Sequence, residues 1–409
     1  MHTPVWLSAQ LSIHPSLQFR DFRFFIVASA FGGFAMMGEM VIIGWLALEL
    51  TDSPLAVGLA SSLRAAPGLL LGIPAGAIAD FVDRRRFIRA LSLVALIPTV
   101  GPAVLITAGL MDFHFVLLFA FLSGCVQAFR QTTGQSFTYD IVGPTGAARG
   151  MAIIALAQRS GGLAGAVAAG ASIQQLGANY AYGLLAVAHL CAFGVQTAIR
   201  LRGQAAPLDQ SHFVQNLREF VTEARRNRTL LTLSMLTAGV EVLGFSHQVL
   251  LPSLARDLLH LGPDGLGVLS GARSMGGIIG LLALSLVGEI RRKGIAFLIV
   301  IHVFGALLVL LGHADSLPLI LICLIFLSGV AALSDVLSQA MMQLSVSNEL
   351  RGRAMGSWIV AIGAGPLGQT QIGAVAALAG VSFALSLNGL ALVALGLAAA
   401  VAVPSLRRL

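Results

Sequence analysis

Charged side chains interrupt several long apolar stretches of this sequence. Two of them are carboxylic acids near the middle of such a stretch, Glu39 and Glu241. A charge in apolar surroundings is costly, so residues of this kind usually face a cavity, a partner or a proton path. A carboxyl group placed there can take up and release a proton, which makes either residue a candidate for proton transfer. Glu39 is the preferred candidate of the two.

Four arginines and one further acid lie in these stretches: Arg64, Arg130, Arg159, Arg273 and Asp335. Arg130, Arg159 and Asp335 are expected to line a cavity or to form a gate that a salt bridge closes. Arg64 and Arg273 permit two interpretations, because each could hold the glutamate of its own half in a static ion pair or line a cavity beside it. The arginines favour an anionic or amphiphilic organic substrate, since a guanidinium group forms paired hydrogen bonds with such anions.

Other kinds of chemistry are not indicated. The cysteines and histidines lack the spacing of metal ligands, so no metal site is predicted. The segment "GAGPLG" at 363–368 matches a dinucleotide-binding motif, but that motif needs a strand before it, which an apolar helix cannot supply. No GxxxxGK[ST] sequence occurs, so ATP binding is not expected. We therefore predict no catalytic residue, no cofactor and no enzyme activity.

The elements that carry these charges are predicted to be membrane-spanning helices. Hydrophobic residues make up 57% of the 409 positions and charged residues 11%, compared with about a quarter charged in soluble domains. A helix of about 20 apolar residues crosses the hydrocarbon core of a bilayer. Twelve such stretches are predicted, at residues 24–50, 55–79, 87–110, 113–138, 151–175, 178–199, 229–255, 265–289, 294–313, 317–344, 354–379 and 381–404. The predicted fold is an all-α, multi-pass membrane protein.

A polar stretch divides the predicted spans into two sets of six. We expect an N-terminal six-helix bundle at 1–199, a cytoplasmic central loop at 200–228 and a C-terminal six-helix bundle at 229–409. The segment "GLASSLRAAPG" aligns with "GVLSGARSMGG" at an offset of 209 residues, which superposes Arg64 on Arg273. Parallel repeats of this kind are typical of transporters whose site lies between two bundles related by a pseudo-two-fold axis.

The net charge of +7 is explained by membrane topology. Most of the 25 lysines and arginines lie near the termini or in alternate loops between spans, with Arg256 as the exception among the loops. Basic residues are retained on the cytoplasmic side of a membrane. Both termini are therefore expected in the cytoplasm, with the chain in the inner (cytoplasmic) membrane. No nucleic-acid partner is predicted.

A charged loop, "GAIADFVDRRRF" at 76–87, follows the second predicted span. Four of its residues match the loop signature of the major facilitator superfamily: Gly76, Asp80, Arg84 and Arg85. Phe81 and Asp83 depart from that signature. Together with "LRAAP" before the loop and "ELRGRAMG" before span eleven, the sequence resembles the exporter branch that includes siderophore (enterobactin-type) exporters and macrolide efflux proteins.

This resemblance implies the major facilitator fold and a latch on its cytoplasmic side. In the family, the loop acid engages the start of span eleven, and the arginine that follows pairs with an acid at the end of span four. The latch locks the cytoplasmic side while the protein faces outward. By resemblance these roles fall on Asp80 and Arg84, with Asp140 as the expected partner and Arg85 as a helper.

The function implied is secondary active transport by alternating access. A proton-coupled exporter (antiporter) of a small organic molecule such as a drug or siderophore is predicted, acting as a monomer in the lipid bilayer. A solute importer or symporter, or a lipid flippase of the same fold, is the alternative. A non-transporting scaffold is disfavoured because it would not need charged groups in the middle of its spans.

Glycine patterns predict local helix geometry. Gly68, Gly72 and Gly76 recur at four-residue spacing in span two, which permits close contact with another helix. The segment "GAGPLG" and its counterpart "RSGGLAG" at 159–165 resemble the glycine and proline kink that antiporters carry in span five.

Overall fold

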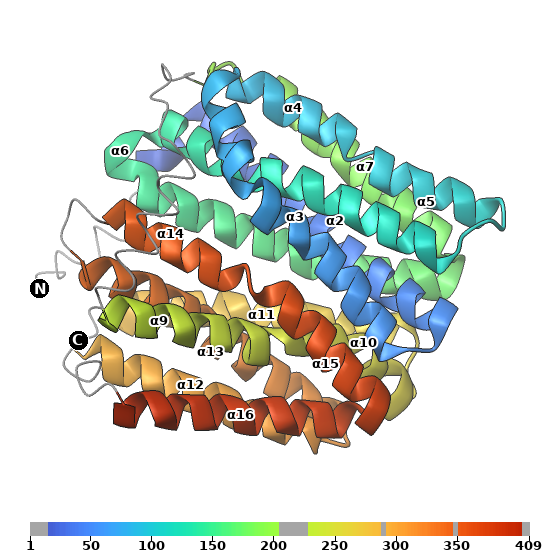
Figure 1. The fold of residues 1–409 in the computed structure, drawn as a ribbon. Helices are drawn as coiled ribbons and strands as arrows, with labels where there is room; N and C mark the ends of the chain where they lie inside the picture. Colours follow the sequence, from blue (N-terminus) through green and yellow to red (C-terminus); the bar gives the residue numbers. More distant parts are fainter. Residues whose placement is uncertain (1–14, 204–227, 288–291, 347–350, 403–409) are drawn as a thin grey trace, which may run out of the picture.

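The computed structural model describes residues 15–203, 228–287, 292–346 and 351–402, and the surroundings of Gly76 and Asp80 lie outside that description. Within these ranges, twelve helical stretches are long and apolar enough to cross a membrane (Figure 1). The predicted all-α fold with twelve spans is confirmed. Helices are expected here, because an apolar solvent leaves the backbone N–H and C=O groups to satisfy one another within a segment.

The N-terminal half begins with a short 3-10 helix at Pro15–Gln18, which precedes its first span. Its helices are α2 (Arg20–Thr51), α3 (Pro54–Phe81), α4 (Arg84–Val94), α5 (Ile97–Thr107), α6 (Phe113–Leu176) and α7 (Ala178–Thr197). The third span is divided into α4 and α5. Polar residues mark two of the helix starts, since Asp83 caps α4 and Asp112 caps α6 by accepting backbone N–H hydrogen bonds.

The C-terminal half repeats this pattern with more breaks. Its seventh span consists of α9 (Arg228–Gly239), a π-helical turn at Val240–Gly244, a 3-10 helix at Phe245–Leu250, α10 (Leu251–Ser253) and a second π-helical turn at Leu254–Leu258. The remaining helices are α11 (Pro263–Val287), α12 (Lys293–Gly312), α13 (Leu317–Leu344), α14 (Arg351–Ile362), α15 (Gly365–Ala379) and α16 (Val381–Ala402). Most of the predicted central loop lies outside the described residues, so its limits stay a prediction.

The fourth and fifth spans differ from their predicted form. Helix α6 contains both, and the predicted loop between residues 138 and 151 is helical on either side of a break at Gly143. Gly143 has φ 73°, a left-handed conformation that glycine adopts without steric cost. Pro144 follows it and lacks the N–H that would continue the hydrogen-bond ladder.

One of the two predicted glycine kinks is wrong. Span eleven does break, between α14 and α15 at the "GAGPLG" segment, where Pro366 lies in the first turn of α15. The segment 159–165 of α6 is helical throughout. It contains no proline, so every residue keeps its backbone N–H donor. Its glycines serve helix packing instead, because a Cβ at Gly161 or Gly165 would collide with the backbone of α2 at Ala30 or Phe34.

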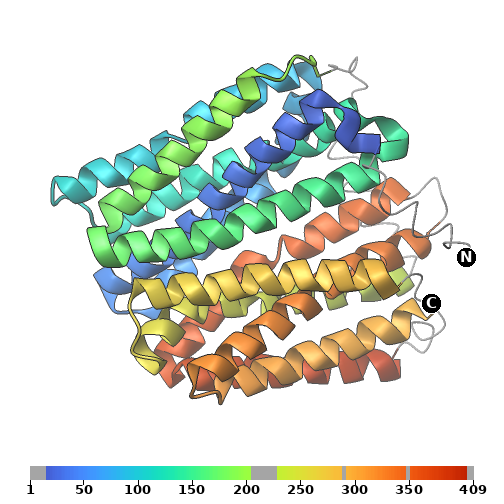
Figure 2. The same cartoon turned by 180° about the vertical axis from the view of Figure 1, so that it is seen from behind.

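Two helix pairs make most of the contacts between the halves: α3 packs along α15 (Figure 1), and α6 packs along α11 (Figure 2). Glycines at equivalent repeat positions make both contacts close. Gly58 faces the backbone of Gln369 and Gly373, and Gly267 faces the backbone of Ala166 and Gly170. Backbones can approach this closely in lipid only where side chains are minimal.

The inter-half contacts concentrate towards one end of the molecule. We call the end that carries Arg84–Arg86, Arg200 and Lys293 the basic end, and the end that carries Asp52 and Arg256 the opposite end. Near the basic end, α14 packs on α9 and α13 of its own half, and it diverges from α3 in Figure 1. Gly68 and Gly72 of α3 have no heavy atom within 4 Å of a built Cβ, so they do not make the predicted close contact here.

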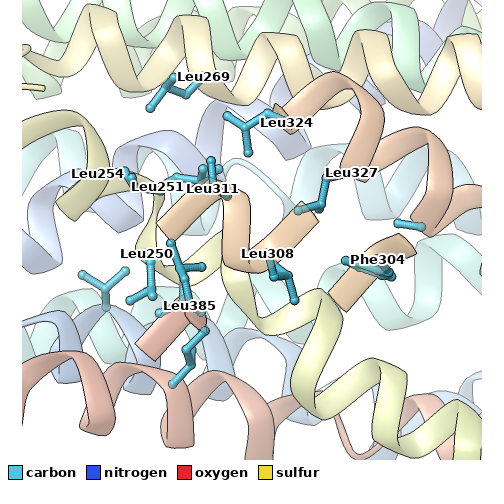
Figure 3. Packing of buried hydrophobic residues seen from close by; sticks show 14 of the residues in the cluster. Leu250, Leu251, Leu254, Leu269, Phe304, Leu308, Leu311, Leu324, Leu327 and Leu385 are labelled. Carbon is cyan, nitrogen blue, oxygen red and sulfur yellow. The ribbon is translucent and has the colours of Figure 1, made fainter. Parts of the chain in front are cut away.

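Buried apolar side chains fill each half. Figure 3 shows such packing within the C-terminal half, where leucines of the seventh span meet those of α12, α13 and α16. Leu254, Leu308 and Leu385 are fully buried there. This packing provides the rigid scaffold from which the charged side chains project.

Candidate functional site

Glu39 lies buried in the N-terminal half, where three helices meet. Its carboxylate accepts a hydrogen bond from Ser123 Oγ of α6 at 2.5 Å. The Arg64 Nη2 atom of α3 lies 3.4 Å from the same carboxylate oxygen. Glu39 itself is only 7% exposed. The pair that the sequence left open is thus formed, and it holds the glutamate between α3 and α6.

Arg130 occupies the same region as Glu39. A small cavity of about 20 Å³, enough for roughly one water molecule, is lined by Glu39, Ser123, Gln127, Arg130 and His189 among others. The Arg130 guanidinium packs on the backbone of α2 and leaves no room for a Cβ at Gly32. Arg130 therefore belongs to the Glu39 cluster within the N-terminal half.

Glu241 lies in the first π-helical turn of the seventh span. Its carboxylate faces the break between α14 and α15, with Oε1 3.0 Å from the position that a Cβ at Gly365 would take. Among the described residues it makes no ion pair or hydrogen bond, and it interacts electrostatically with Asp335 of α13. Turns of π-helix are rare and are frequent at functional sites.

Asp335 of α13 and Arg159 of α6 belong to different halves. They interact electrostatically, but no ion pair within 4.0 Å joins them in the part of the chain that the structure describes. The Arg159 guanidinium lies against Gly277 of α11. The predicted salt bridge between Arg159 and Asp335 is thus unmade in this state, and Arg130 lies apart in the Glu39 cluster.

A cavity of about 260 Å³ lies between the halves and receives both repeat-related arginines. Its polar lining consists of Ser61, Arg64, Gln248, Ser270, Arg273 and Gln369. Apolar side chains complete the wall, among them Met37 and Met40 of α2 and Leu266 of α11. The combination of an apolar wall with few polar groups is typical of small-molecule sites.

Arg273 does not pair with Glu241, contrary to one sequence interpretation. Its Nη2 donates to Gln248 Oε1 at 2.9 Å. The physical reason lies in the repeat, because the offset of 209 residues that superposes Arg64 on Arg273 also superposes Glu39 on Gln248. The equivalent of the Glu39–Arg64 pair is therefore Gln248–Arg273. This equivalence can be read from the sequence, because Gln248 lies 209 residues after Glu39.

At the basic end, Arg84 and Asp140 form a buried ion pair. Arg84 Nη1 lies 2.8 Å from both carboxylate oxygens of Asp140, and Nε donates to the Ala79 carbonyl at 2.9 Å. Gly203 passes directly over this pair. The predicted latch positions Gly76 and Asp80 belong to α3, and their surroundings lie outside the described residues.

The remaining loop residues have separate contacts. Arg85 Nη1 donates to the Arg200 carbonyl at 2.9 Å. Asp83, one of the two departures from the family signature, accepts a hydrogen bond from the Arg86 N–H at 3.2 Å and so caps α4. Phe81, the other departure, is 46% exposed. The charges of this loop therefore divide between a buried pair and surface contacts.

An ion pair joins the two halves at the opposite end. Arg256 Nη2 donates to Asp52 Oδ1 at 2.5 Å, and Nη1 donates to the Leu48 carbonyl at 3.3 Å. Arg256 Nε also donates to Asp257 of its own turn at 2.7 Å. In the sequence, Arg256 was notable only as the one basic residue in a loop on the other side of the membrane. No sequence pattern indicated Asp52 as its partner.

Metal or cofactor ligands are not gathered anywhere in the described residues: no three His, Cys, Asp or Glu side chains lie close enough together to hold a metal ion. The site offers paired charges, hydrogen-bonding groups and a cavity between two bundles.

Nearly the whole chain matches a known family. Residues 12–408 match the model of a family described as transmembrane secretion effector. The chain belongs to this family of major facilitator transporters. The predicted membership of the major facilitator superfamily is confirmed. The protein is a transporter of small substrates rather than an enzyme.

A multidrug efflux pump, Tap from Mycolicibacterium fortuitum, is 26% identical to this transporter over 385 residues, which cover 90% of this chain and 92% of Tap. Among solved structures, a peptide transporter POT in complex with sulfate has a TM-score of 0.76 at 13% identity and covers 95% of both chains. A bacterial homologue of the human lysosomal transporter Spinster, in an inward-facing and unoccupied conformation, has a TM-score of 0.67 at 15% identity and covers 95% of this chain and 97% of that one. These structures establish the shared fold.

Proposed function

We propose that this transporter is a proton-coupled exporter of small organic molecules that works by alternating access. The observation that carries the proposal is the cavity of about 260 Å³ that both halves line, with Arg64 and Arg273 at equivalent repeat positions. Transporters built from parallel repeats bind their substrate between the repeats and rock the halves about that site. The relative Tap is a multidrug efflux pump, which supports export as the direction.

Under this proposal the basic end lies on the cytoplasmic side of the inner membrane, because lysine and arginine are retained on that side. Contacts between the halves concentrate at the opposite end, where α3 meets α15 and Arg256 meets Asp52. The described state is then closed towards the outside and faces inward. An exporter loads its substrate from the cytoplasm in this state.

Glu39 is the preferred proton carrier. A carboxylate loses its charge when it takes up a proton, and Glu39 holds contacts with Arg64 and Ser123 that depend on that charge. Protonation would therefore release α3 and α6 from a common anchor. The mobility of these helices matters because both contact the other half.

Glu241 is the second candidate, for a different reason. It lies at the break between α14 and α15 and interacts with Asp335, which in turn interacts with Arg159 of the other half. A proton on Glu241 or Asp335 would change the attraction between the halves. Charged groups near the middle of a membrane are costly, so such a change can bias a conformational equilibrium.

The loop between α3 and α4 acts as the cytoplasmic latch. Arg84 and Asp140 hold the start of α4 on α6, and Asp80 engages the start of span eleven when the protein faces outward, with Arg85 assisting. The pair is already formed while the described state is closed at the opposite end. Its role is then to keep the latch loop in position, and the movable contact is that of Asp80.

Inside-out membrane vesicles test the direction of transport. The vesicles should accumulate a fluorescent amphiphile on addition of respiratory substrate, and a protonophore should abolish the accumulation. Vesicles without the transporter are the control. Accumulation only in right-side-out vesicles would instead establish an importer of the same fold.

A further inference from the structure

Arg273 is a half-buried cation whose charge no acidic side chain among the described residues balances within ion-pair distance. Gln248 accepts the hydrogen bond from Nη2 at 2.9 Å, and the Nε atom is buried without a hydrogen-bond partner. No acidic side chain among the described residues lies within ion-pair distance of the guanidinium. Arg159, the other charged group that interacts with it, has the same sign. A charge held in apolar surroundings without a counter-charge is strongly disfavoured.

The equivalent arginine of the N-terminal half has the acidic partner that Arg273 lacks. At the equivalent position Arg64 has Glu39 within 3.4 Å, whereas the second half offers the neutral amide of Gln248 in place of that acid. An amide can hold a guanidinium in position, but it does not neutralise it. Both arginines line one cavity, so the charge balance of that cavity is incomplete on the side of the second half.

We propose that Arg273 binds the carboxylate or sulfonate group of an amphiphilic organic anion that this exporter carries. The inference rests on the proposed function, which supplies the substrate, and it adds the chemical class and the anchoring residue. A guanidinium group presents a planar fork of N–H donors that matches the two oxygens of such an anion. Gln248 fixes the orientation of that fork by accepting from Nη2.

The rest of the cavity fits the apolar body of such a molecule. Met37, Met40 and Leu266 lie among its lining residues. Methionine side chains are unbranched and adapt to different apolar shapes. The volume of about 260 Å³ holds the anionic group and part of a drug-sized body, since complete small-molecule pockets measure roughly 300–1,000 Å³.

Equilibrium binding to the purified, full-length transporter tests the proposal without a gradient. The probes are a dansylated amino acid with a free carboxylate and its methyl ester, which differ in charge but keep the same apolar body. Wild type should bind the acid about tenfold to a hundredfold more tightly than the ester, the range of a charge-assisted hydrogen bond. Equal affinities in the wild type would overturn the proposal.

Two substitutions place the preference at Arg273. Arg273→Gln removes the cation, and Gln248→Glu supplies an internal counter-charge like that of the first half, so both should bind acid and ester within about twofold of each other. Arg273→Lys should keep a reduced preference. Arg86→Gln removes an arginine whose side chain is 76% exposed, and should leave the preference unchanged.

The outcomes separate this proposal from that of export. A wild type that prefers the acid but moves neither probe in vesicles would retain the anion site and refute the exporter. A preference that survives in both Arg273→Gln and Gln248→Glu would refute the anion site alone. Gln248→Glu keeps the shape of the side chain, so it decides the question even where Arg273→Gln does not fold.

Discussion

Arg84 anchors the start of α4 to α6 through its ion pair with Asp140. The side chains of Arg84 and Asp140 are each 9% exposed, and Nη1 meets both carboxylate oxygens. Removing one partner of a buried ion pair is destabilising, because the charge of the other partner loses that compensation. The neighbouring Arg86 has a side chain that is 76% exposed, with Nε 3.8 Å from Asp83 Oδ2.

Asp140→Asn should therefore destabilise the protein by about 3 kcal/mol. Arg86→Gln, the matched control, should change the free energy of unfolding by less than about 0.5 kcal/mol. Unfolding of the purified protein by SDS titration measures both. Equal midpoints for the two variants would show that the Arg84–Asp140 pair contributes nothing to the fold.

Individual charged residues could be predicted from the sequence, but their partners only in part. The ion pair of Arg84 with Asp140 was predicted from the family signature. The pair of Glu39 with Arg64 was one of two interpretations, based on their positions in neighbouring spans of the same half. The hydrogen bond between Arg273 and Gln248 was not predicted. The second bundle repeats the position of the arginine, but it has a neutral glutamine where the first bundle has a glutamate. Arg256 with Asp52 joins residues about 200 positions apart, and no local pattern reports such a contact.

Around Gly161 and Gly165, helix α6 meets helix α2 through backbone atoms. A Cβ at Gly161 would meet the carbonyl oxygen of Ala30, and one at Gly165 would meet that of Phe34. Backbone atoms cannot rotate away, so an added methyl group forces the helices apart. At Gly183 of α7, by contrast, no heavy atom lies within 4 Å of the position that a Cβ would take.

Gly161→Ala should accordingly cost about 1–3 kcal/mol by overpacking. Gly183→Ala makes the same chemical change in open surroundings and should be neutral or stabilising by up to about 1 kcal/mol. Folded yield and thermal unfolding in detergent compare the two. A Gly161→Ala protein as stable as Gly183→Ala would mean that α2 and α6 lie further apart than described.

The number and order of the spans could be predicted because each needs only a long apolar run. The breaks within them could not be predicted with equal success. The kink at Gly143 and the π-helical turns of the seventh span arise from local φ/ψ values and tertiary packing, which composition does not report. The break at 363–368 was predicted because a proline makes it visible in sequence.

The two halves are joined at the opposite end by packing and by one exposed ion pair. Arg256 reaches Asp52 and the Leu48 carbonyl from the other half. Asp52 is 84% exposed at its side chain, so the pair is worth no more than about 1 kcal/mol. A small free energy of this kind suits a transporter, because a much stronger contact would hold the protein in one conformational state.

Arg256→Gln should shift the equilibrium towards the outward-facing state by up to about fivefold, the equivalent of 1 kcal/mol. A cysteine at Ser61, in the inter-half cavity of a protein without its native cysteines, should react faster with a membrane-impermeant maleimide from outside. Asp257→Asn is the control, because Asp257 contacts Arg256 without joining the halves. Unchanged labelling in Arg256→Gln would exclude a gating role for the pair.

The most direct test of proton-coupled export combines Glu39→Gln with Glu241→Gln in proteoliposomes under an imposed pH gradient. For the wild type, we expect an amphiphilic substrate to move against the proton flow and to dissipate the gradient reported by an internal pH dye. Glu39→Gln should lose most of that coupling and Glu241→Gln a smaller part, while both proteins still bind substrate. Coupling that persists undiminished in the double variant would contradict a proton site at either glutamate.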